Sequence, residues 1–242
     1  MPKKIIIKTT DDKNISWILN TTLNKSKWLI IFVHGLTWNQ NEHIFVNWSK
    51  YFNSKWYSTY RFNLYGKGKN IRKLEETSLK DHIIDINKVV SYFQKKWIEK
   101  IFLVWHSFGW LSILYSDLSI ISKVVLWDSS IGWDELLWDV FYDKIKKNYY
   151  INWWDWYKYF INKNMYNDFC VEPKYHIKKI KEIKLPIKII CAEKWLKKPA
   201  ERYYKAANSP KDFCIIAWAT HCFDEKWAEK KLFNETYNWI KD

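Results

Sequence analysis

Short apolar runs alternate with segments of helical period along most of the chain. An uninterrupted apolar run predicts a buried strand, and apolar residues recurring at every third or fourth position predict a helix. Strands separated by helices predict a mostly parallel sheet with helices on both faces. The predicted strands are Leu29–Val33, Ser58–Phe62, Ile101–Val104, Lys123–Leu126, Ile187–Cys191 and Phe213–Ala217, and the predicted helices are Glu42–Asn53, Ser78–Lys95, Ser107–Leu118, Ala200–Ala207 and Asp224–Ile240.

Two segments depart from this alternation. Ile5–Lys8 and Ile15–Leu19 flank the polar turn Asp11–Asn14, which predicts an antiparallel hairpin. Residues 129–185 are rich in aromatic side chains and lack the alternation. We expect this segment to be a helical cap insertion over a pocket at one sheet edge, or alternatively an ordinary pair of packing helices. Either way it lies within one domain that spans residues 1–242.

Composition favours a compact globular protein. Of the 242 residues, 48% are hydrophobic and 27% are charged, a balance that disordered chains lack. No apolar run approaches the roughly 18 residues of a membrane span, and Ile5–Ile7 is too short for the core of a secretory signal, so we expect a cytoplasmic protein. The cysteines form no CxxC pair, which predicts buried free thiols rather than disulfides or a zinc site. They are Cys170, Cys191, Cys214 and Cys222.

The formal net charge of +14 raises the question of an anionic partner. Lysine supplies nearly all of it, because Arg61, Arg72 and Arg202 are the only arginines in the sequence. Proteins that read phosphates and bases favour the forked guanidinium of arginine. Since the lysines are spread along the whole chain, we expect no nucleic-acid partner.

The segment from Ile101 to Trp110 places a serine where a strand runs directly into a helix. A serine on such a turn projects its hydroxyl above the sheet, and the helix N-terminus behind it favours developing negative charge. The segment resembles the nucleophile elbow of the α/β-hydrolase family, whose motif is GxSxG. Ser107 and Gly109 match this motif, whereas Trp105 stands at its first glycine.

Three further segments resemble the same family in the same order. The sequence His-Gly-Leu at 34–36 is similar to the family's oxyanion loop, residues 63–68 resemble the loop after the next strand, and His221 follows the last strand. The resemblance implies an α/β-hydrolase fold in which the amides of Leu36 and Phe108 hold the oxyanion. It also implies that the histidine takes the proton of the serine and later returns it to the leaving group.

The carboxylate that would orient His221 has two candidates. The family usually has an aspartate after the penultimate strand, where the turn Cys191–Lys197 contains only Glu193. Another family arrangement places the acid after the preceding strand, where Asp128 ends an apolar run. Asp128 could equally cap a helix or turn, and both candidates stay open.

The resemblance implies a serine hydrolase that cleaves a small carboxylic ester or thioester, with no cofactor or metal. Within the family the loops look most like small bacterial esterases and serine aminopeptidase-like hydrolases, so amide cleavage stays open. One rival is a non-catalytic protein of the same fold that binds an acidic or aromatic partner. Another is a lysine-rich binder of an anionic polymer or membrane surface. The oligomeric state does not follow from the sequence.

The remaining histidines have plainer interpretations. We expect His43, His82 and His176 to be surface or partly buried side chains rather than metal ligands. The run Asp81–Asp85 predicts a helix with a solvated acidic face. His106 resembles the family's usual spacer before the serine, and we expect it to pack locally.

Tryptophan and glycine deviate from average usage in opposite directions. The chain has 18 tryptophans and 5 glycines, whereas an average of about 7% predicts roughly 17 glycines. We hypothesise that about 12 tryptophans are native glycines misread from UGA codons, which would restore the expected count; Trp127 and Trp239 are kept as genuine. If the sequence is literal, the elbow is distorted and the chain is inactive. The tryptophans at expected glycine positions are Trp38, Trp56, Trp97, Trp105, Trp110, Trp195 and Trp218.

Overall fold

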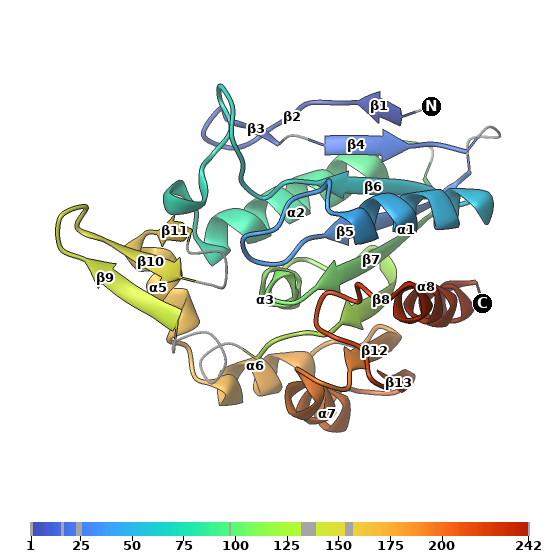
Figure 1. The fold of residues 1–242 in the computed structure, drawn as a ribbon. Coiled ribbons are helices and arrows are strands. Elements are labelled where there is room, and N and C mark those ends of the chain that lie inside the picture. The colour runs from blue at the N-terminus through green and yellow to red at the C-terminus, as the bar shows by residue number, and fades with distance from the viewer. Residues whose placement is uncertain are drawn as a thin grey trace.

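A central sheet of eight strands organises the part of the chain that the computed structural model describes, residues 2–15, 17–22, 26–96, 98–131, 139–152 and 157–241 (Figure 1). Six of these strands are parallel, as expected from apolar runs that are buried on both faces. In spatial order the strands are β1 (Pro2–Lys4), β4 (Trp17–Asn20), β6 (Ser58–Phe62), β5 (Trp28–Val33), β7 (Lys100–His106), β8 (Ile121–Trp127), β12 (Ile187–Ala192) and β13 (Lys211–Ile216).

The predicted N-terminal hairpin is confirmed and has two parts. The short strands β2 (Ile7–Lys8) and β3 (Asn14–Ile15) pair antiparallel with each other. Beyond them β1 pairs antiparallel with β4, and β4 pairs antiparallel with β6. The hairpin therefore adds two antiparallel strands to one edge of the parallel sheet.

Helices cover both faces of the central sheet. Helices α1 and α8 bury their apolar stripes against one face, where they form a core cluster with strands β5, β7 and β8. Helices α2, α3 and α7 pack in a second cluster on the other face. These helices are α1 (His43–Ser54), α2 (Leu79–Gln94), α3 (Gly109–Leu114), α7 (Lys197–Ala206) and α8 (Lys226–Ile240).

Helix α3 ends four residues before its predicted end at Leu118. The hydroxyl of Ser116 donates to the carbonyl oxygen of Ser112 at 2.7 Å, and the amide of Asp117 donates to the side chain of Asn87 at 2.9 Å. Both bonds offer the chain an alternative to the next helical turn. The helix that follows the candidate nucleophile is therefore short.

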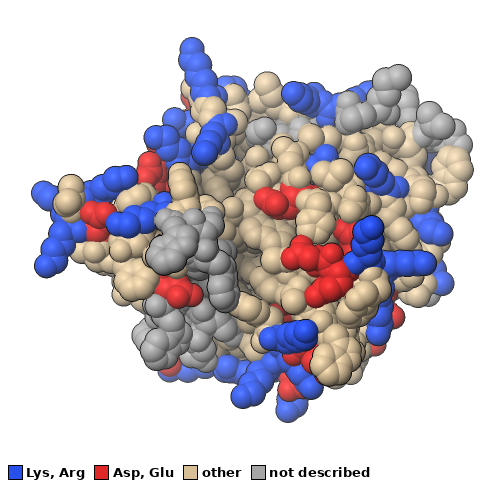
Figure 2. Space-filling model, viewed as in Figure 1, with Lys and Arg blue, Asp and Glu red and all other residues tan. Residues whose placement is uncertain are grey.

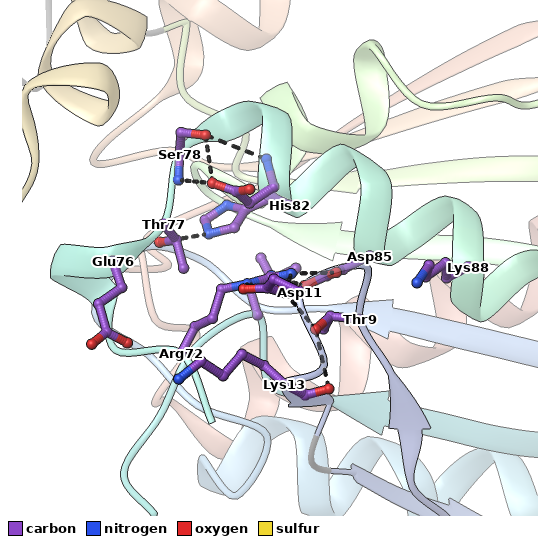
Figure 3. A network of polar contacts seen from close by, with 12 residues as sticks. Thr9, Asp11, Lys13, Arg72, Glu76, Thr77, Ser78, His82, Asp85 and Lys88 are labelled. Carbon is purple, nitrogen blue, oxygen red and sulfur yellow. Dashed lines mark hydrogen bonds and ion pairs between the residues drawn. The ribbon is translucent and has the colours of Figure 1, made fainter. Parts of the chain in front are cut away.

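Arg72 joins segments that are far apart in the sequence (Figure 3). Its guanidinium donates to Asp11 of the hairpin, with Nη2 and Oδ1 2.8 Å apart, and to the carboxylate of Asp85 on α2. Arg72 and Asp85 are both buried. Removing one partner of such a pair leaves an uncompensated buried charge, so the network fixes the hairpin against α2.

The expected solvated acidic face on α2 is wrong for its last member. Asp85 is 1% exposed and so is His82, because the helical period places both on the same buried stripe as Ile86 and Val89. The His82 ring compensates with a 3.2 Å contact between Nε2 and the hydroxyl of Thr77. His82 is thus a core histidine.

The other two histidines differ in their environments. His176 is also buried, with its Nδ1 2.9 Å from the hydroxyl of Tyr115. His43 is exposed and pairs with Asp224 at 3.4 Å. The expectation of a surface or partly buried position therefore holds for His43 alone.

The insertion is mixed rather than helical. Where helices were expected, strands β9 (Val140–Asp143), β10 (Asn148–Asn152) and β11 (Lys158–Ile161) form an antiparallel sheet that projects from one side of the molecule (Figure 1). The physical reason is that aromatic and β-branched residues, which favour strands, make up much of these segments, and that Ile151 and Ile161 are buried. Helices α5 (Lys163–Phe169) and α6 (Pro173–Ile180) follow. Trp153 to Trp156 lie outside the described residues.

Two further expectations concerned the state of the cysteines and the absence of a membrane span. All four cysteines are free thiols, as predicted, but Cys191 alone is buried and the other three are half-buried. Within the described ranges, none of the helices combines the length and the hydropathy that a membrane crossing requires.

Candidate active site

Ser107 occupies the sharp turn between β7 and α3. Its φ of 56° lies in the left-handed region that residues other than glycine rarely adopt. The amide of Ser107 donates to the carbonyl oxygen of Trp127 at 3.0 Å, which ties the turn to the neighbouring strand β8. The residue is 9% exposed and lies just after the carboxyl end of a central strand.

Gly109 and Gly35 let two chain segments meet at this turn. A Cβ at Gly109 would lie 2.6 Å from the carbonyl oxygen of His34, and one at Gly35 would lie 2.9 Å from the Cβ of Ser107. Real Cβ atoms cannot approach so closely, so glycine is required at both positions. The segment 34–36 therefore lies directly against the serine.

A chain of hydrogen bonds links three of the residues singled out in the sequence. The hydroxyl of Ser107 lies 3.0 Å from Nε2 of His221, and Nδ1 of His221 lies 2.6 Å from Oδ2 of Asp128. Asp128 is fully buried, and its other oxygen accepts from the amide of Ala192 at 3.0 Å. Since Nδ1 donates to the carboxylate, Nε2 is left to accept the proton of the serine.

Glu193, the other candidate acid, lies elsewhere. Its carboxylate accepts a hydrogen bond of 2.8 Å from the backbone amide of Trp218, and its side chain is exposed. Asp128 and Glu193 follow the neighbouring parallel strands β8 and β12, which explains why sequence alone left both open. The geometry brings Asp128, and not Glu193, to the histidine.

Buried donors hold the carbonyl of Gly35. Nδ1 of His34 lies 2.7 Å from that oxygen, and the hydroxyl of Tyr65 donates to it at 3.2 Å. Nε2 of His34 accepts from the amide of Leu64 at 3.1 Å, so Nδ1 carries the proton. Burial lowers the pKa of His34 to about 4, which keeps this ring neutral.

The amide that follows Gly35 is free to bind a ligand. In a trans peptide the carbonyl and the next N–H point in opposite directions, so fixing the oxygen of Gly35 also fixes the N–H of Leu36. Among the described residues, neither the amide of Leu36 nor that of Phe108 donates to another group. Both residues are buried, and an unpaired buried N–H is rare. The N–H groups of Leu36 and Phe108 thus keep unused hydrogen-bonding capacity beside Ser107.

His106 has a role that the sequence did not indicate. Its Nε2 donates to the backbone carbonyl of His221 at 2.8 Å, and burial holds the pKa of the His106 ring well below its usual value. It therefore does more than pack locally, because it holds the loop that carries His221.

The thiol beside His221 offers no alternative nucleophile. Burial, together with nearby carboxylates such as Asp224, raises the pKa of Cys222 to about 12, so the thiol stays protonated at neutral pH.

In Figure 2, Asp and Glu side chains gather near the middle of the displayed face and Lys and Arg lie mostly toward its margin. This face is not a uniform positive surface despite the net charge of the chain.

The two tryptophans of the elbow are accommodated by stacking. The rings of Trp105 and Trp110 are fully buried, 4.8 Å apart and inclined by 10°. Among the described residues neither indole N–H finds an acceptor, which also holds for Trp239. Trp127, in contrast, donates to the hydroxyl of Thr236 at 2.9 Å.

Other tryptophans lie at the surface in unusual backbone conformations. Trp56 and Trp218 have φ angles of 68° and 62°, and their exposed fractions are 59% and 71%. Trp195 is also half-exposed and lies over His221, with ring centroids 5.8 Å apart. Trp97 lies outside the described residues.

Comparison with known proteins places this architecture. No protein-family model and no curated protein sequence matches the chain. Est1E from Butyrivibrio proteoclasticus, solved with ferulic acid bound, matches with a TM-score of 0.80 and 20% identity over 98% of this chain and 100% of its own. The esterase domain of a Rhodothermus marinus protein matches with a TM-score of 0.78 and 13% identity, over 100% of this chain and 98% of its own.

A third similar structure is the α/β hydrolase GrgF from Penicillium, with a TM-score of 0.78 and 12% identity over 100% of this chain and 98% of its own. These likenesses and the sheet topology show that the chain has the α/β-hydrolase fold. The sequence-based fold prediction is confirmed in its central sheet and its covering helices.

Proposed function

We propose that this chain is a serine hydrolase that cleaves a small carboxylic ester or thioester through an acyl-enzyme. The observation that carries the proposal is the hydrogen-bond chain from Ser107 through His221 to Asp128. In this proposal Ser107 is the nucleophile, His221 is the general base and acid, and Asp128 orients the imidazole. Glu193 is a surface residue of the adjacent turn.

The first half of the reaction forms the acyl-enzyme. Oγ of Ser107 attacks the carbonyl carbon of the ester while its proton moves to Nε2 of His221. The carbonyl oxygen becomes an oxyanion that accepts from the amides of Leu36 and Phe108. When this intermediate collapses, the bond to the leaving oxygen or sulfur breaks, and His221 donates its proton to that atom.

The second half returns the free enzyme. A water molecule gives its proton to His221 and attacks the acyl carbon, and the same two amides hold the new oxyanion. The bond from the acyl carbon to Oγ of Ser107 then breaks as the proton returns to Oγ, and the carboxylic acid leaves. Asp128 keeps Nδ1 protonated throughout, which stabilises the imidazolium in both halves.

We propose that residues 129–185 form a cap beside this site. Phe169 of α5 packs edge-on against Phe108, the residue after the nucleophile, with ring centroids 4.8 Å apart. Tyr149 of β10 stacks on Tyr166 of the same helix at 3.9 Å. The small sheet is thus connected to the elbow through α5, and a substrate at Ser107 would lie next to the insertion.

Ester cleavage is favoured over amide cleavage by the similar structures. One of them is named as an esterase domain, and another, Est1E, was solved with ferulic acid bound. Amide or peptide cleavage of the aminopeptidase type is the alternative, since the same serine chemistry serves both bonds. A set of matched esters and anilides of one acyl group would separate the two.

We further propose that Trp105 and Trp110, together with Trp56 and Trp218, are glycines in the native protein. Left-handed backbone at two exposed residues is what glycine adopts without strain. Glycine at 105 would complete the GxSxG motif, and glycine at 110 would directly follow it. Trp127 stays a tryptophan, because its indole N–H is buried and bonded.

A fluorophosphonate probe tests the proposed function. We expect covalent labelling of the native-source protein, or of a recombinant form carrying Trp105→Gly and Trp110→Gly, and no labelling after Ser107→Ala. The matched control is Ser112→Ala. Ser112 is a buried serine on helix α3, which follows Ser107, and its hydroxyl contacts His82 rather than His221. Well-folded native-source protein that stays unlabelled would instead support a non-catalytic binder.

A further inference from the structure

A cavity of 810 Å³ lies between the oxyanion loop, the loop after β6 and the insertion. Its wall includes Thr37 and Asn39 from the first segment, Asn63 from the second, and Phe160 from β11. Strand β11 also packs against the short 3₁₀ helix η1 (Leu74–Glu76), which contributes to the same wall. The cavity is large enough for a drug-sized organic molecule.

The cavity adjoins the proposed active site. Tyr65 lines it and also donates its hydroxyl to the carbonyl of Gly35, which lies against Ser107. Trp38 lines it as well, and its ring stacks on that of His106 at 4.5 Å. A glycine at position 38 would widen the cavity toward His106. A substrate bound at Ser107 can therefore extend into this space.

Aromatic rings form much of the wall. Besides Trp38, the aromatic lining includes Tyr65, Tyr159 and Phe160, which would remain if position 38 were glycine. Leu74 adds an aliphatic surface. Aromatic side chains bind flat rings through stacked or edge-on contacts. A site with this lining selects an aromatic group over a short alkyl chain.

The charged residues of the wall are three lysines and one carboxylate, Glu75, and the lysines differ in their partners. Lys73 lies 3.7 Å from the carboxylate of Glu75, and Lys158 lies 3.6 Å from that of Asp143. Among the described residues, Lys67 has no carboxylate within ion-pair distance. Two of the three ammonium groups are thus compensated, and Lys67 leaves a positive charge at the cavity.

We propose that this cavity holds the aromatic part of the ester and that Lys67 contacts a negative charge on that part. The inference rests on the proposed ester hydrolysis and specifies its substrate as an ester of an anionic aromatic compound. Glu75, the carboxylate that lines this wall, is already paired with Lys73, so a cationic substituent would face Lys67 without an unpaired carboxylate among the described lining residues. A neutral substituent would leave the ammonium group of Lys67 without a partner.

Two matched substrate pairs test the inference. One pair is phenyl acetate and 4-acetoxybenzoate, which differ by a carboxylate on the alcohol side. The other is methyl benzoate and monomethyl terephthalate, which differ by a carboxylate on the acyl side. For each pair the ratio of kcat/KM for the anionic ester to that for the neutral ester is measured in wild type, Lys67→Gln and Lys67→Glu. Comparing ratios between variants cancels the intrinsic reactivity of each ester.

We expect the ratio in at least one pair to fall about threefold in Lys67→Gln and further in Lys67→Glu, as for a solvent-accessible ion pair. The difference between variants should shrink as salt is added. The control is Lys69→Gln, because Lys69 is an exposed lysine of the same loop outside the cavity wall. Its ratios should equal those of wild type.

The outcomes separate this inference from the proposed function. Hydrolysis of phenyl acetate and labelling of Ser107, with equal charge ratios in wild type, both Lys67 variants and the Lys69 control, would overturn the inference and leave the serine hydrolase intact. Equal falls in the Lys67 and Lys69 variants would overturn it too, because they would indicate a general field of the loop. Loss of both hydrolysis and labelling in the wild type would overturn the proposed function and the inference with it.

Discussion

Two clusters of polar side chains in this fold each contain a buried carboxylate, Asp85 in one and Asp128 in the other, and they are built in different ways. In the network of Arg72, Asp11 and Asp85, one guanidinium donates hydrogen bonds to two carboxylates, and the Arg72 side chain is buried (Figure 3). In the cluster of Ser107 and His221, the histidine side chain keeps 21% exposure. The second cluster also adjoins two amides that have no acceptor among the described residues.

The difference separates a structural cluster from a reactive one. The guanidinium of Arg72 is occupied by hydrogen bonds to Asp11 and Asp85, so we expect it to stabilise the fold and not to bind a ligand. The site holds Ser107 in a strained left-handed conformation and leaves hydrogen-bonding capacity unused. Changes in the first cluster should therefore alter stability with little effect on chemistry, and changes in the second should do the reverse.

The largest effect is expected from Ser107→Ala. Removing the proposed nucleophile should lower kcat for an activated ester by about 10⁴-fold or more, whereas the midpoint of urea unfolding should move little, because the substitution removes a single hydroxyl. Steady-state kinetics and urea titration of the same preparation measure both. A variant that retains a tenth of the activity would contradict the assignment.

Asp128→Asn comes next and sharpens the choice between the two acids. The amide cannot hold Nδ1–H of His221 as a carboxylate does, so kcat should fall by about 10³- to 10⁴-fold. Glu193→Gln is the matched control and should cost less than about threefold, since Glu193 binds a backbone amide. The reverse ranking in ester hydrolysis assays would assign the orienting role to Glu193.

Arg72→Met tests the structural side of the comparison. It leaves Asp85 buried without its cation, and breaking a buried pair costs about 3 to 5 kcal/mol of folding free energy. Chemical denaturation should show this loss, while kcat of the folded fraction stays within about twofold. A large fall in kcat at unchanged stability would mean that the network belongs to the site.

Acidification should weaken the fold through its buried histidines. Burial lowers the pKa of His34 to about 4 and that of His82 to about 3, below the value near 6.5 in the unfolded chain. Between these limits the unfolded state binds more protons, so stability is lost as pH falls from about 6.5 toward 4. At pH 5 each of these two rings lowers the free energy of unfolding by about 2 kcal/mol.

The matched variant for this prediction is His82→Gln. It removes one titrating ring, so the loss of stability between pH 7 and pH 5 should be smaller than in wild type by about 2 kcal/mol. Urea unfolding at the two pH values measures the difference. An equal loss of unfolding free energy between pH 7 and pH 5 in the two proteins would show that His82 does not take up a proton on unfolding.

Tyr65→Phe should give the smallest effect and the most specific one. Losing one of the two bonds that hold the Gly35 carbonyl loosens the amide of Leu36, so kcat should fall about tenfold while KM changes little. A readout beyond activity is the affinity for a boronic acid transition-state analogue, which should weaken in parallel. An equal loss of affinity for a carboxylate product would indicate a general packing defect instead.

The parallel sheet could be predicted because continuous apolar runs such as Leu29–Val33 leave few alternatives. The elbow could also be predicted, since Ser107 and Gly109 stand at the end of such a run. The insertion could not be, because aromatic residues suit strands as well as helices and the tertiary contacts of Ile151 and Ile161 decide between them.

The orienting acid and the supporting shell depended on three-dimensional contacts. Two acids followed neighbouring strands, and only the position of His221 separates Asp128 from Glu193. The bond from His106 to the carbonyl of His221 joins residues 115 positions apart in the sequence. A single sequence carries no signal for such a contact.

The most direct test of the central claim is tandem mass spectrometry of the fluorophosphonate-labelled protein from its native source. The tryptic peptide from Ile101 to Lys123 contains Trp105, Ser107 and Trp110, so one spectrum reports the modified residue and both neighbouring identities. We expect the adduct on Ser107 and the masses of glycine at positions 105 and 110. Folded protein with no adduct on Ser107 would contradict the proposed serine hydrolase, and tryptophan masses at both positions would contradict the recoding.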